Sequence, residues 1–298
     1  MSGELIPPAL RIRLGELRLT SRHAIGVQGI GLHHSRSRGA GLEFAQYRAY
    51  EPGDELRQID WKLYARSDRF FVRESERESP LDVWILLDAS ASMAQADGGR
   101  PQWSRLDAAR CLAACLGELA LRQGDRFGLV GLHVDGLRLL PPDTGTRQRD
   151  RLHLELRALR AGGAFPSEER LTPLWERIGS RDLVVLLSDC FDDNAVALAE
   201  RLAAARREVL AIQLLTVEER DFPFRGGHRF HDPETGEELL GDGAAMREEY
   251  LARFGRAQAT LDARFDAAGI RHARYVLDEA PDLPLRKLFG RHDAAEYA

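Results

Sequence analysis

Two runs of five apolar residues constrain the fold of this chain more than any other feature: VWILL at 83–87 and LVVLL at 183–187. Asp88 follows the first run directly, and Asp189 follows the second after one serine. Short apolar runs rich in branched residues are typical of strands buried on both faces of a sheet, and they fall far below the ~20 residues of a membrane span. We therefore expect both strands at the centre of a mostly parallel sheet, side by side.

Amphipathic and apolar segments alternate along the rest of the chain. Helical spacing predicts helices at 104–122, 147–159, 169–178, 194–207, 243–268 and 283–290, and further strands are predicted at 126–134, 209–216 and 271–277, with a hairpin partner at 136–140. This alternation predicts an α/β fold with a doubly wound, mostly parallel sheet and helices on both of its faces. The turn sequence DPETG at 232–236 predicts a β-hairpin inserted within about 217–242.

The first 80 residues differ from this pattern and are expected to form an N-terminal extension or subdomain (1–80), with the main domain at 81–298. Strands are predicted in FAQYRAY (44–50) and RFFVRESE (69–76). Between them, Asp54 is expected to cap a short helix that reaches Ala65.

Charge and lysine content exclude two function classes. The net charge of −5 provides no basic excess for binding nucleic acid. Only Lys62 and Lys287 are lysines, and neither lies in the glycine-rich loop of a P-loop ATPase, so any ATP-driven work must come from a partner. Because the N-terminal sequence has no uninterrupted apolar core of a secretory signal, we expect a cytoplasmic protein.

The segment Asp88-Ala-Ser-Ala-Ser92 places one carboxylate and two hydroxyls in a single turn after a buried strand. In a doubly wound sheet, ligands bind beyond the carboxyl ends of the strands, and an adjacent strand would bring Asp189 to the same place. Oxygen ligands of this kind suit Mg²⁺. The predicted metal ligands are therefore Asp88, Ser90, Ser92 and Asp189.

This D-x-S-x-S pattern resembles the metal-ion-dependent adhesion site of von Willebrand factor A domains. The segment upstream resembles domain-of-unknown-function family fifty-eight, whose motifs are G-x-H-x-S, G-x-G-x-E-F, R-x-Y-x-x-G-D, R-x-I-D-W and A-R. In this chain they correspond to Gly31, His33 (or His34), Ser35, Gly39, Gly41, Glu43, Phe44, Arg48, Tyr50, Gly53, Asp54, Arg57, Ile59, Asp60, Trp61, Ala65 and Arg66. The resemblance covers nearly the whole chain.

One ligand of the family pattern is missing. Von Willebrand A sites usually take a threonine from a glycine-rich loop, whereas this loop reads Gly162-Gly163-Ala164-Phe165. Ser167 or Thr172 would have to supply the hydroxyl instead. Without it, Mg²⁺ would keep an extra water and bind weakly, or the site would hold no metal at all.

The motif segment before the main domain has two interpretations. In the first, acidic and basic residues form a salt-bridged clamp that docks the extension on the sheet, with Trp61 as an apolar anchor. In the second, the segment recognises a partner directly. The residues concerned are Arg48, Tyr50, Asp54, Arg57, Asp60, Trp61 and Arg66.

The family resemblance implies a protein-interaction module with a degenerate adhesion site and no catalytic residue. It also implies an AAA+ ATPase of the MoxR type as partner, in chaperone-like assembly or maturation of a protein complex whose identity the sequence does not give. The alternative is a Mg²⁺-dependent phosphohydrolase that uses the strand-end Asp88. It would need a second aspartate where Ser90 stands and a lysine downstream. The third interpretation is a metal- or redox-binding protein built on the nine histidines and three cysteines, in which His33–His34 and His228–His231 are the only clusters. We favour scattered solvent or core histidines over this interpretation, since the sequence contains neither H-E-x-x-H nor C-x-x-C.

Overall fold

The computed structural model describes residues 4–21, 46–50, 59–74, 80–231 and 236–290. The chain divides into two compact units, one made of Met1–His23 with Pro80–Ala298 and the other of Ala24–Ser79. We describe each unit by itself.

The main unit is built around one sheet of six strands within the described residues. Its strands are β3 (Asp82–Asp88), β4 (Arg126–His133), β5 (Gly136–Asp143), β6 (Leu183–Ser188), β7 (Glu208–Leu215) and β10 (Arg271–Val276). They lie in the order β10-β7-β6-β3-β4-β5, and every pairing is parallel except that of β4 with β5. The structure confirms the predicted α/β fold, the single antiparallel member and the central position of β3 and β6.

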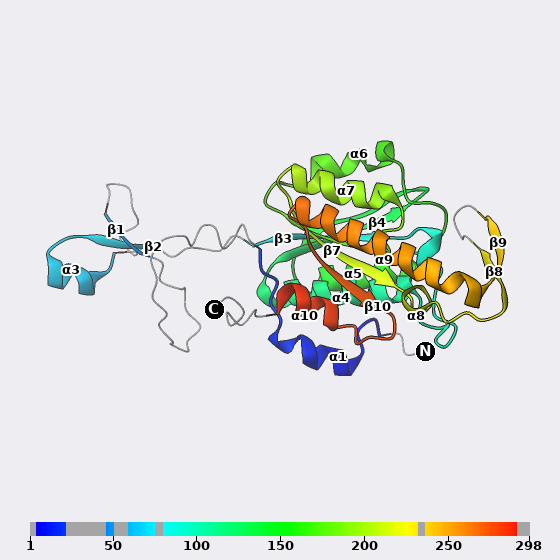
Figure 1. Ribbon diagram of the computed structural model, residues 1–298. Coiled ribbons are helices and arrows are strands. Elements are labelled where there is room, and N and C mark those ends of the chain that lie inside the picture. Colours follow the sequence, from blue (N-terminus) through cyan, green and yellow to red (C-terminus); the bar gives the residue numbers. More distant parts are fainter. Residues whose placement is uncertain (1–3, 22–45, 51–58, 75–79, 232–235, 291–298) are drawn as a thin grey trace, which may run out of the picture. The chain divides into compact units, whose positions relative to one another are not determined.

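Helices cover both faces of this sheet (Figure 1). They are α1 (Pro8–Arg13), α4 (Arg105–Gln123), α5 (Thr146–Ala158), α6 (Glu168–Arg177), α7 (Asp193–Ala204), α8 (Val217–Asp221), α9 (Gly243–Ala267) and α10 (Leu283–Phe289), with short 3-10 turns η1 (Leu14–Glu16) and η4 (Ala91–Ala94). Alternate residues of β3 enter different cores: Val83, Ile85 and Leu87 join the helices α1, α4, α5 and α10, while Trp84 and Leu86 join α6, α7 and α9. Burial on both faces explains why this strand is continuously apolar.

Local sequence fixes the start and the end of α4, the helix after the D-x-S-x-S turn. Ser104 and Asp107 form a reciprocal capping box at its N-terminus, and Gly124 ends it with a positive φ of 79°. Arg105 is therefore the first residue of the helix, held at the carboxyl edge of the sheet next to η4.

The predicted single extension of residues 1–80 is divided differently in the structure. Residues 4–21 belong to the main unit, because Leu10, Leu14 and Leu17 lie in the same hydrophobic core as α4 and α10. Their spacing puts the three leucines on one side of the α1–η1 segment. Only Ala24–Ser79 forms a separate unit, whose boundary near residue 80 agrees with the prediction.

In the second unit, β1 (Gln46–Ala49) pairs antiparallel with β2 (Phe71–Glu74), and α3 (Trp61–Ser67) lies between them in sequence. The two predicted strands are confirmed. The predicted cap of the helix is corrected: Asp60 accepts hydrogen bonds from the backbone of Lys62 and Leu63, while Asp54 lies outside the described residues.

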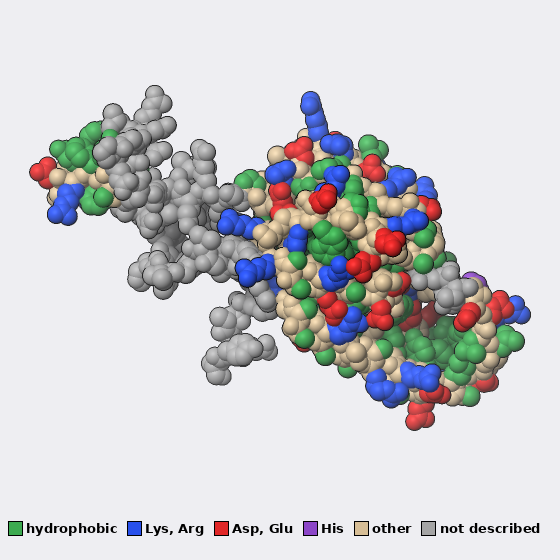
Figure 2. Space-filling view, turned by 90° about the horizontal axis from the view of Figure 1, so that it is seen from above, with side chains coloured by type: hydrophobic (Ala, Val, Ile, Leu, Met, Phe, Trp, Pro, Cys, Tyr) green, Lys and Arg blue, Asp and Glu red, His purple; other side chains and the backbone are tan. Residues whose placement is uncertain are grey.

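The predicted insertion contains α8 and a hairpin of β8 (Gly227–His231) with β9 (Glu238–Asp242). Aromatic rings of Phe222, Phe224, Phe230 and Tyr250 contact one another beneath the hairpin. Leu239 and Leu240 stay 56% and 71% exposed. Figure 2 shows hydrophobic side chains gathered around a hollow at the end of the main unit where the hairpin and the start of α9 lie.

The assignment of residues 4–21 to the main unit is testable with two variants. Leu14 is fully buried and Ile12 is 81% exposed. We expect Leu14→Ala to lower the free energy of unfolding by about 2–4 kcal/mol, and Ile12→Ala to change it by less than about 0.5 kcal/mol. Urea denaturation followed by tryptophan fluorescence measures both. Equal, small effects would show that this segment does not contribute to the core.

Candidate functional site

The two strand-end aspartates lie on neighbouring strands. β3 pairs in parallel with β6, with Leu87 opposite Leu187, so Asp88 and Asp189 emerge at the same edge of the sheet. The Ser188 hydroxyl donates a 2.6 Å hydrogen bond to the Oδ2 atom of Asp88. We call Asp88, Ser90, Ser92, Ser188 and Asp189 the strand-end cluster; all five residues are buried.

The two serines of the turn lie close to each other. The backbone N–H of Ser90 donates to the Oδ1 atom of Asp88 at 2.8 Å, which folds the turn back over the carboxylate. The Oγ atoms of Ser90 and Ser92 are 3.0 Å apart. Neighbouring ligands of an octahedral Mg²⁺ are separated by about the same distance, since each lies ~2.1 Å from the ion at right angles. The two hydroxyls thus have the separation of adjacent metal ligands.

Burial dominates the electrostatics of Asp88. Desolvation, followed by repulsion from the nearby Asp189, raises the pKa of Asp88 to about 7. The hydrogen bonds from Ser188 and Ser90 oppose this rise without cancelling it. Asp88 is therefore a buried carboxylate hydrogen-bonded to neutral groups, an arrangement in which either a proton or a cation lowers the free energy.

A cation already neutralises the other carboxylate. The fully buried guanidinium of Arg105 donates to the Oδ2 atom of Asp189 at 2.8 Å and to the backbone carbonyl of Ser92 at 3.0 Å. Its second nitrogen pairs with Glu219 of α8. Burial lowers the pKa of Arg105, with Asp189 opposing that effect, but a guanidinium stays charged in proteins. Asp189 thus has a permanent internal counter-ion, whereas Asp88 accepts hydrogen bonds from no cation within the described residues.

The residues present fit a divalent cation with an incomplete set of ligands. Asp88, Ser90 and Ser92 supply three oxygens, and the glycine loop is held against the same turn. Ala91 donates its N–H to the carbonyl of Gly163 at 2.7 Å, and the N–H of Gly162 donates to the carbonyl of Ala89 at 2.9 Å. Ala164, the next residue of this loop, offers no hydroxyl, so water would have to complete the coordination.

The proposed substitute hydroxyls are not part of the cluster. Ser167 is the residue before α6 and Thr172 lies within this helix, and both are exposed while the hydroxyls of the cluster are buried. Over the described ranges, three or more histidine, cysteine or acidic residues nowhere gather in a geometry suited to a metal ion. A site at the strand ends would therefore depend on Asp88 and serine hydroxyls.

Three residues of this site were not predicted from the sequence. Ser188 bonds to Asp88, Arg105 to Asp189, and Glu219 to Arg105. Ser188 stands one place before Asp189, and Arg105 stands directly after the capping serine Ser104, which fixes it at the edge of the sheet. No local signal marks Glu219, because α8 reaches Arg105 only through the tertiary fold.

The structure describes five of the seven predicted clamp or partner-binding residues upstream of the main domain. Asp60 is buried and caps α3, Tyr50 is half-buried, and Arg66 is exposed in the last turn of the helix. Trp61 is 57% exposed and contacts Tyr64 and Phe70 edge-on. Arg48 lies on β1 opposite Val72, and Asp54 and Arg57 fall outside the described residues. Whether this segment is a clamp or a recognition surface stays a prediction.

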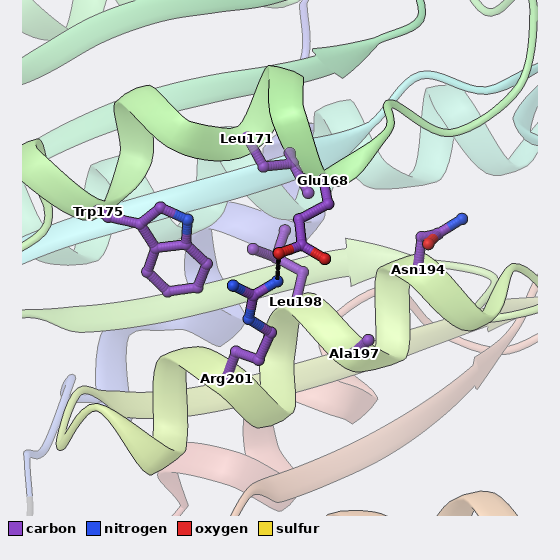
Figure 3. A pocket seen from close by; sticks show the side chains of 7 residues that line it. All are labelled: Glu168, Leu171, Trp175, Asn194, Ala197, Leu198 and Arg201. Atoms are coloured by element: carbon purple, nitrogen blue, oxygen red, sulfur yellow. Dashed lines mark ion pairs between the residues drawn. The ribbon is translucent and has the colours of Figure 1, made fainter.

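A shallow recess between α6 and α7 lies apart from the predicted ligands (Figure 3). Its charged residues already pair with each other, because Glu168 and Arg201 form an ion pair of 2.5 Å and the guanidinium of Arg201 lies 5.1 Å from the ring centre of Trp175. We assign it no binding role.

One protein family and several relatives are similar to this chain in sequence. The family described as "Protein of unknown function DUF58" matches residues 46–260. Uncharacterized protein Rv1480 of Mycobacterium tuberculosis and Uncharacterized protein Mb1516 of Mycobacterium bovis are each 28% identical over 242 residues, which are 79% of this chain and 74% of the relative.

Solved structures give more distant matches. BatB, a conserved hypothetical protein from Bacteroides thetaiotaomicron, matches with a TM-score of 0.41 and 16% identity over 70% of this chain and 97% of its own. The SpRpn10 VWA domain matches with a TM-score of 0.40 and 13% identity, over 70% and 94% of the two chains.

The sheet order, the strand-end aspartates and the D-x-S-x-S turn define an α/β protein of the von Willebrand A-like class. Within that class, the chain belongs to the DUF58 family. In the part of the chain that the structure describes, no helix has the length and apolar character needed to cross a bilayer.

The raised pKa of Asp88 predicts a specific dependence of stability on pH. Since the pKa rises from 3.8 to about 7 on folding, the folded state binds this proton more tightly than the unfolded chain does. The stabilisation is complete below about pH 4 and is lost as the pH rises toward 7. We expect wild type in EDTA to lose stability relative to Asp88→Asn over this range, by at most about 1.4 kcal/mol per pH unit.

Urea denaturation of both proteins between pH 4 and 8, with EDTA present, measures this difference. The amide of Asp88→Asn does not titrate. Its oxygen can accept the N–H of Ser90, and its NH2 group can donate to the Ser188 hydroxyl, which also accepts hydrogen bonds. Parallel curves for the two proteins would contradict the raised pKa.

Proposed function

We propose that this protein is a non-catalytic protein-interaction module that binds its partner at the strand-end cluster. The observation that carries the proposal is the arrangement of Asp88, Ser90 and Ser92. In the part of the chain that the structure describes, the buried Asp88 carboxylate has no cationic hydrogen-bond partner, and the two hydroxyls beside it are separated as adjacent metal ligands are. We propose Mg²⁺, weakly held, as the ion of this degenerate adhesion site.

When bound, the ion would supply an open coordination position for an oxygen ligand of the partner. The chain's own residues prepare that position. Asp88 provides the negative charge, and the turn fixed by the Ser90–Asp88 hydrogen bond orients the hydroxyls. The missing hydroxyl at Ala164 leaves one ligand fewer than a complete site has. A carboxylate from the partner would therefore improve the coordination as well as form an ionic contact.

An exposed aromatic ring borders the cluster. Phe191 follows Asp189 by two residues, is 49% exposed, and lies 5.2 Å from the Arg105 guanidinium. Exposed aromatic side chains beside a central polar contact are frequent anchors of protein interfaces. We propose that Phe191 contributes apolar contact area to the same partner.

The proposed partner is an AAA+ ATPase of the MoxR type, in chaperone-like assembly or maturation of a protein complex. This part rests on the family resemblance and on the chain's lack of a P-loop lysine, which means that ATP hydrolysis would have to come from a partner. An ATP-dependent pair agrees with the cytoplasmic location expected from the sequence.

No arrangement among the described residues supports the alternative function, a Mg²⁺-dependent phosphohydrolase. Ser90 stands where an acid would be needed, and it is part of a buried hydroxyl pair with Ser92. The nearest cation, Arg105, is fully enclosed and bound to Asp189 and Glu219, so it is not accessible to a phosphate.

Enzyme assays test the non-catalytic part of this proposal. We expect the purified protein with Mg²⁺ to hydrolyse neither ATP nor p-nitrophenyl phosphate above background, because it lacks the paired acids and the lysine that phosphoryl transfer uses. Turnover that disappears in Asp88→Asn would favour the phosphohydrolase instead.

Calorimetry with the AAA+ partner tests the role of the cluster. We expect Mg²⁺ and the partner to strengthen each other's binding by the same factor, so that EDTA weakens partner binding to wild type. Asp88→Ala should bind the partner weakly in both conditions while keeping its fold, since Asp88 lies at the end of β3 and belongs to neither apolar core. Ala164→Thr should raise the affinity for Mg²⁺ in the free protein.

Asp135→Ala is the matched control, because Asp135 is an exposed carboxylate in the turn after β4 with an 89% exposed side chain. It should bind the partner as wild type does. Equal affinities for wild type and Asp88→Ala, in Mg²⁺ and in EDTA, would show that the partner does not use the strand-end cluster.

A further inference from the structure

The charge next to the strand-end cluster is unusual, because a guanidinium is enclosed there with three carboxylates. Arg105 is fully buried, the side chain of Asp189 is 3% exposed and that of Glu219 is 16% exposed. Burial lowers the pKa of Arg105, and the negative charges of Asp189 and Asp88 oppose this lowering. Within the described residues, the side chains of Asp88 and Arg105 do not share a hydrogen bond. When all four groups are ionised, three carboxylates and one guanidinium leave a net charge of two negative units.

We propose that Arg105 sets the affinity of the strand-end cluster for a divalent cation. This inference rests on the proposed function, since it concerns the same ion. Arg105 occupies the Oδ2 atom of Asp189 and keeps this carboxylate from acting as a full-strength ligand, so the ion is left to Asp88, Ser90 and Ser92. Its positive charge also repels the ion directly, and in a buried site this repulsion is strong.

Stability alone does not explain the presence of Arg105. A buried ion pair costs desolvation free energy, and replacing one with apolar residues is often neutral or stabilising. One nitrogen of this guanidinium, Nε, is also buried without a hydrogen-bond partner among the described residues. A charge retained at such a cost is better explained by an effect on the neighbouring cluster.

Glu219 regulates how strongly Arg105 acts. It pairs with Arg105 through one oxygen and accepts the N–H of Thr216 with the other at 2.9 Å, which fixes the carboxylate at the start of α8. Two further contacts tie α8 to the segment after the D-x-S-x-S turn. Val217 donates its N–H to Asp97 at 2.6 Å, and the N–H of Gly98 donates to Glu218 at 2.9 Å. The charge balance at the cluster therefore includes the insertion.

The binding of Mn²⁺ alone, measured by electron paramagnetic resonance, tests this inference on the full-length protein. We expect Arg105→Gln to bind Mn²⁺ about tenfold or more tightly than wild type, because it frees Asp189 and removes a repelling charge. Arg105→Lys keeps the charge and should stay near wild type. A merely structural role for Arg105 would disturb both variants alike.

A second pair of variants covers the case in which Arg105→Gln does not fold. Glu219→Gln removes one negative charge from the site, and Asp221→Asn removes one from the exposed, Arg220-paired end of the same helix. We expect Glu219→Gln to weaken Mn²⁺ binding severalfold and Asp221→Asn to leave it unchanged. Mn²⁺ affinities of Arg105→Gln and Glu219→Gln equal to that of wild type would overturn this inference.

The same Mn²⁺ measurements distinguish a wrong role for Arg105 from a wrong ion site. If wild type binds Mn²⁺ and Asp88→Asn does not, the ion site stands even when Arg105→Gln shows no change, and only the role of Arg105 is wrong. If neither wild type nor Arg105→Gln binds Mn²⁺ at millimolar concentrations, both the ion site and the role of Arg105 are wrong.

Discussion

The ion pair between Arg105 and Asp189 joins the start of α4 to the end of β6 where neither charge reaches water. Breaking such a pair by removing one partner leaves a buried, uncompensated charge, at a cost of several kcal/mol. The same guanidinium holds the carbonyl of Ser92 and the carboxylate of Glu219. One charge thereby holds together the D-x-S-x-S turn, Asp189 and the insertion. Among the residues described, Arg105 neutralises Asp189 but makes no ion pair with Asp88, so the Asp88 carboxylate is the one available to a proton or a metal ion.

The sheet determines where these charges meet. β3 and β6 are apolar and buried on both faces between their ends. The parallel chain direction brings Asp88 and Asp189, which follow these apolar runs, to one edge of the sheet. The helices that follow the two strands, α4 and α7, pack on opposite faces of the sheet beside this edge. A turn that would be solvated on an isolated strand becomes enclosed, and enclosure is what raises the pKa of Asp88. The pairing of β3 with β6 therefore determines both the position and the burial of the two aspartates.

Much of this was accessible from the sequence, for identifiable reasons. Continuous apolar runs and helical spacing are properties of local sequence, and they predicted the strands of the sheet and the meeting of Asp88 with Asp189. They also predicted every helix of the main unit that the structure describes except α1 and α8. The partners of these aspartates were not accessible. Glu219 and Arg105 are 114 residues apart, and their contact exists only because α8 docks beside η4. Residues 4–21 were assigned to the wrong unit because the spacing of Leu10, Leu14 and Leu17 shows an apolar face without showing which core it joins.

A crystal structure of the wild-type protein soaked in Mn²⁺, with anomalous scattering recorded, tests the central claim most directly. The account predicts one anomalous peak within coordination distance of Asp88, Ser90 and Ser92, water at the position that Ala164 leaves open, and Arg105 still bonded to Asp189. A peak at Asp189 with Arg105 displaced would contradict the assignment of the two carboxylates. The absence of any peak at this edge under saturating Mn²⁺ would contradict the ion site itself.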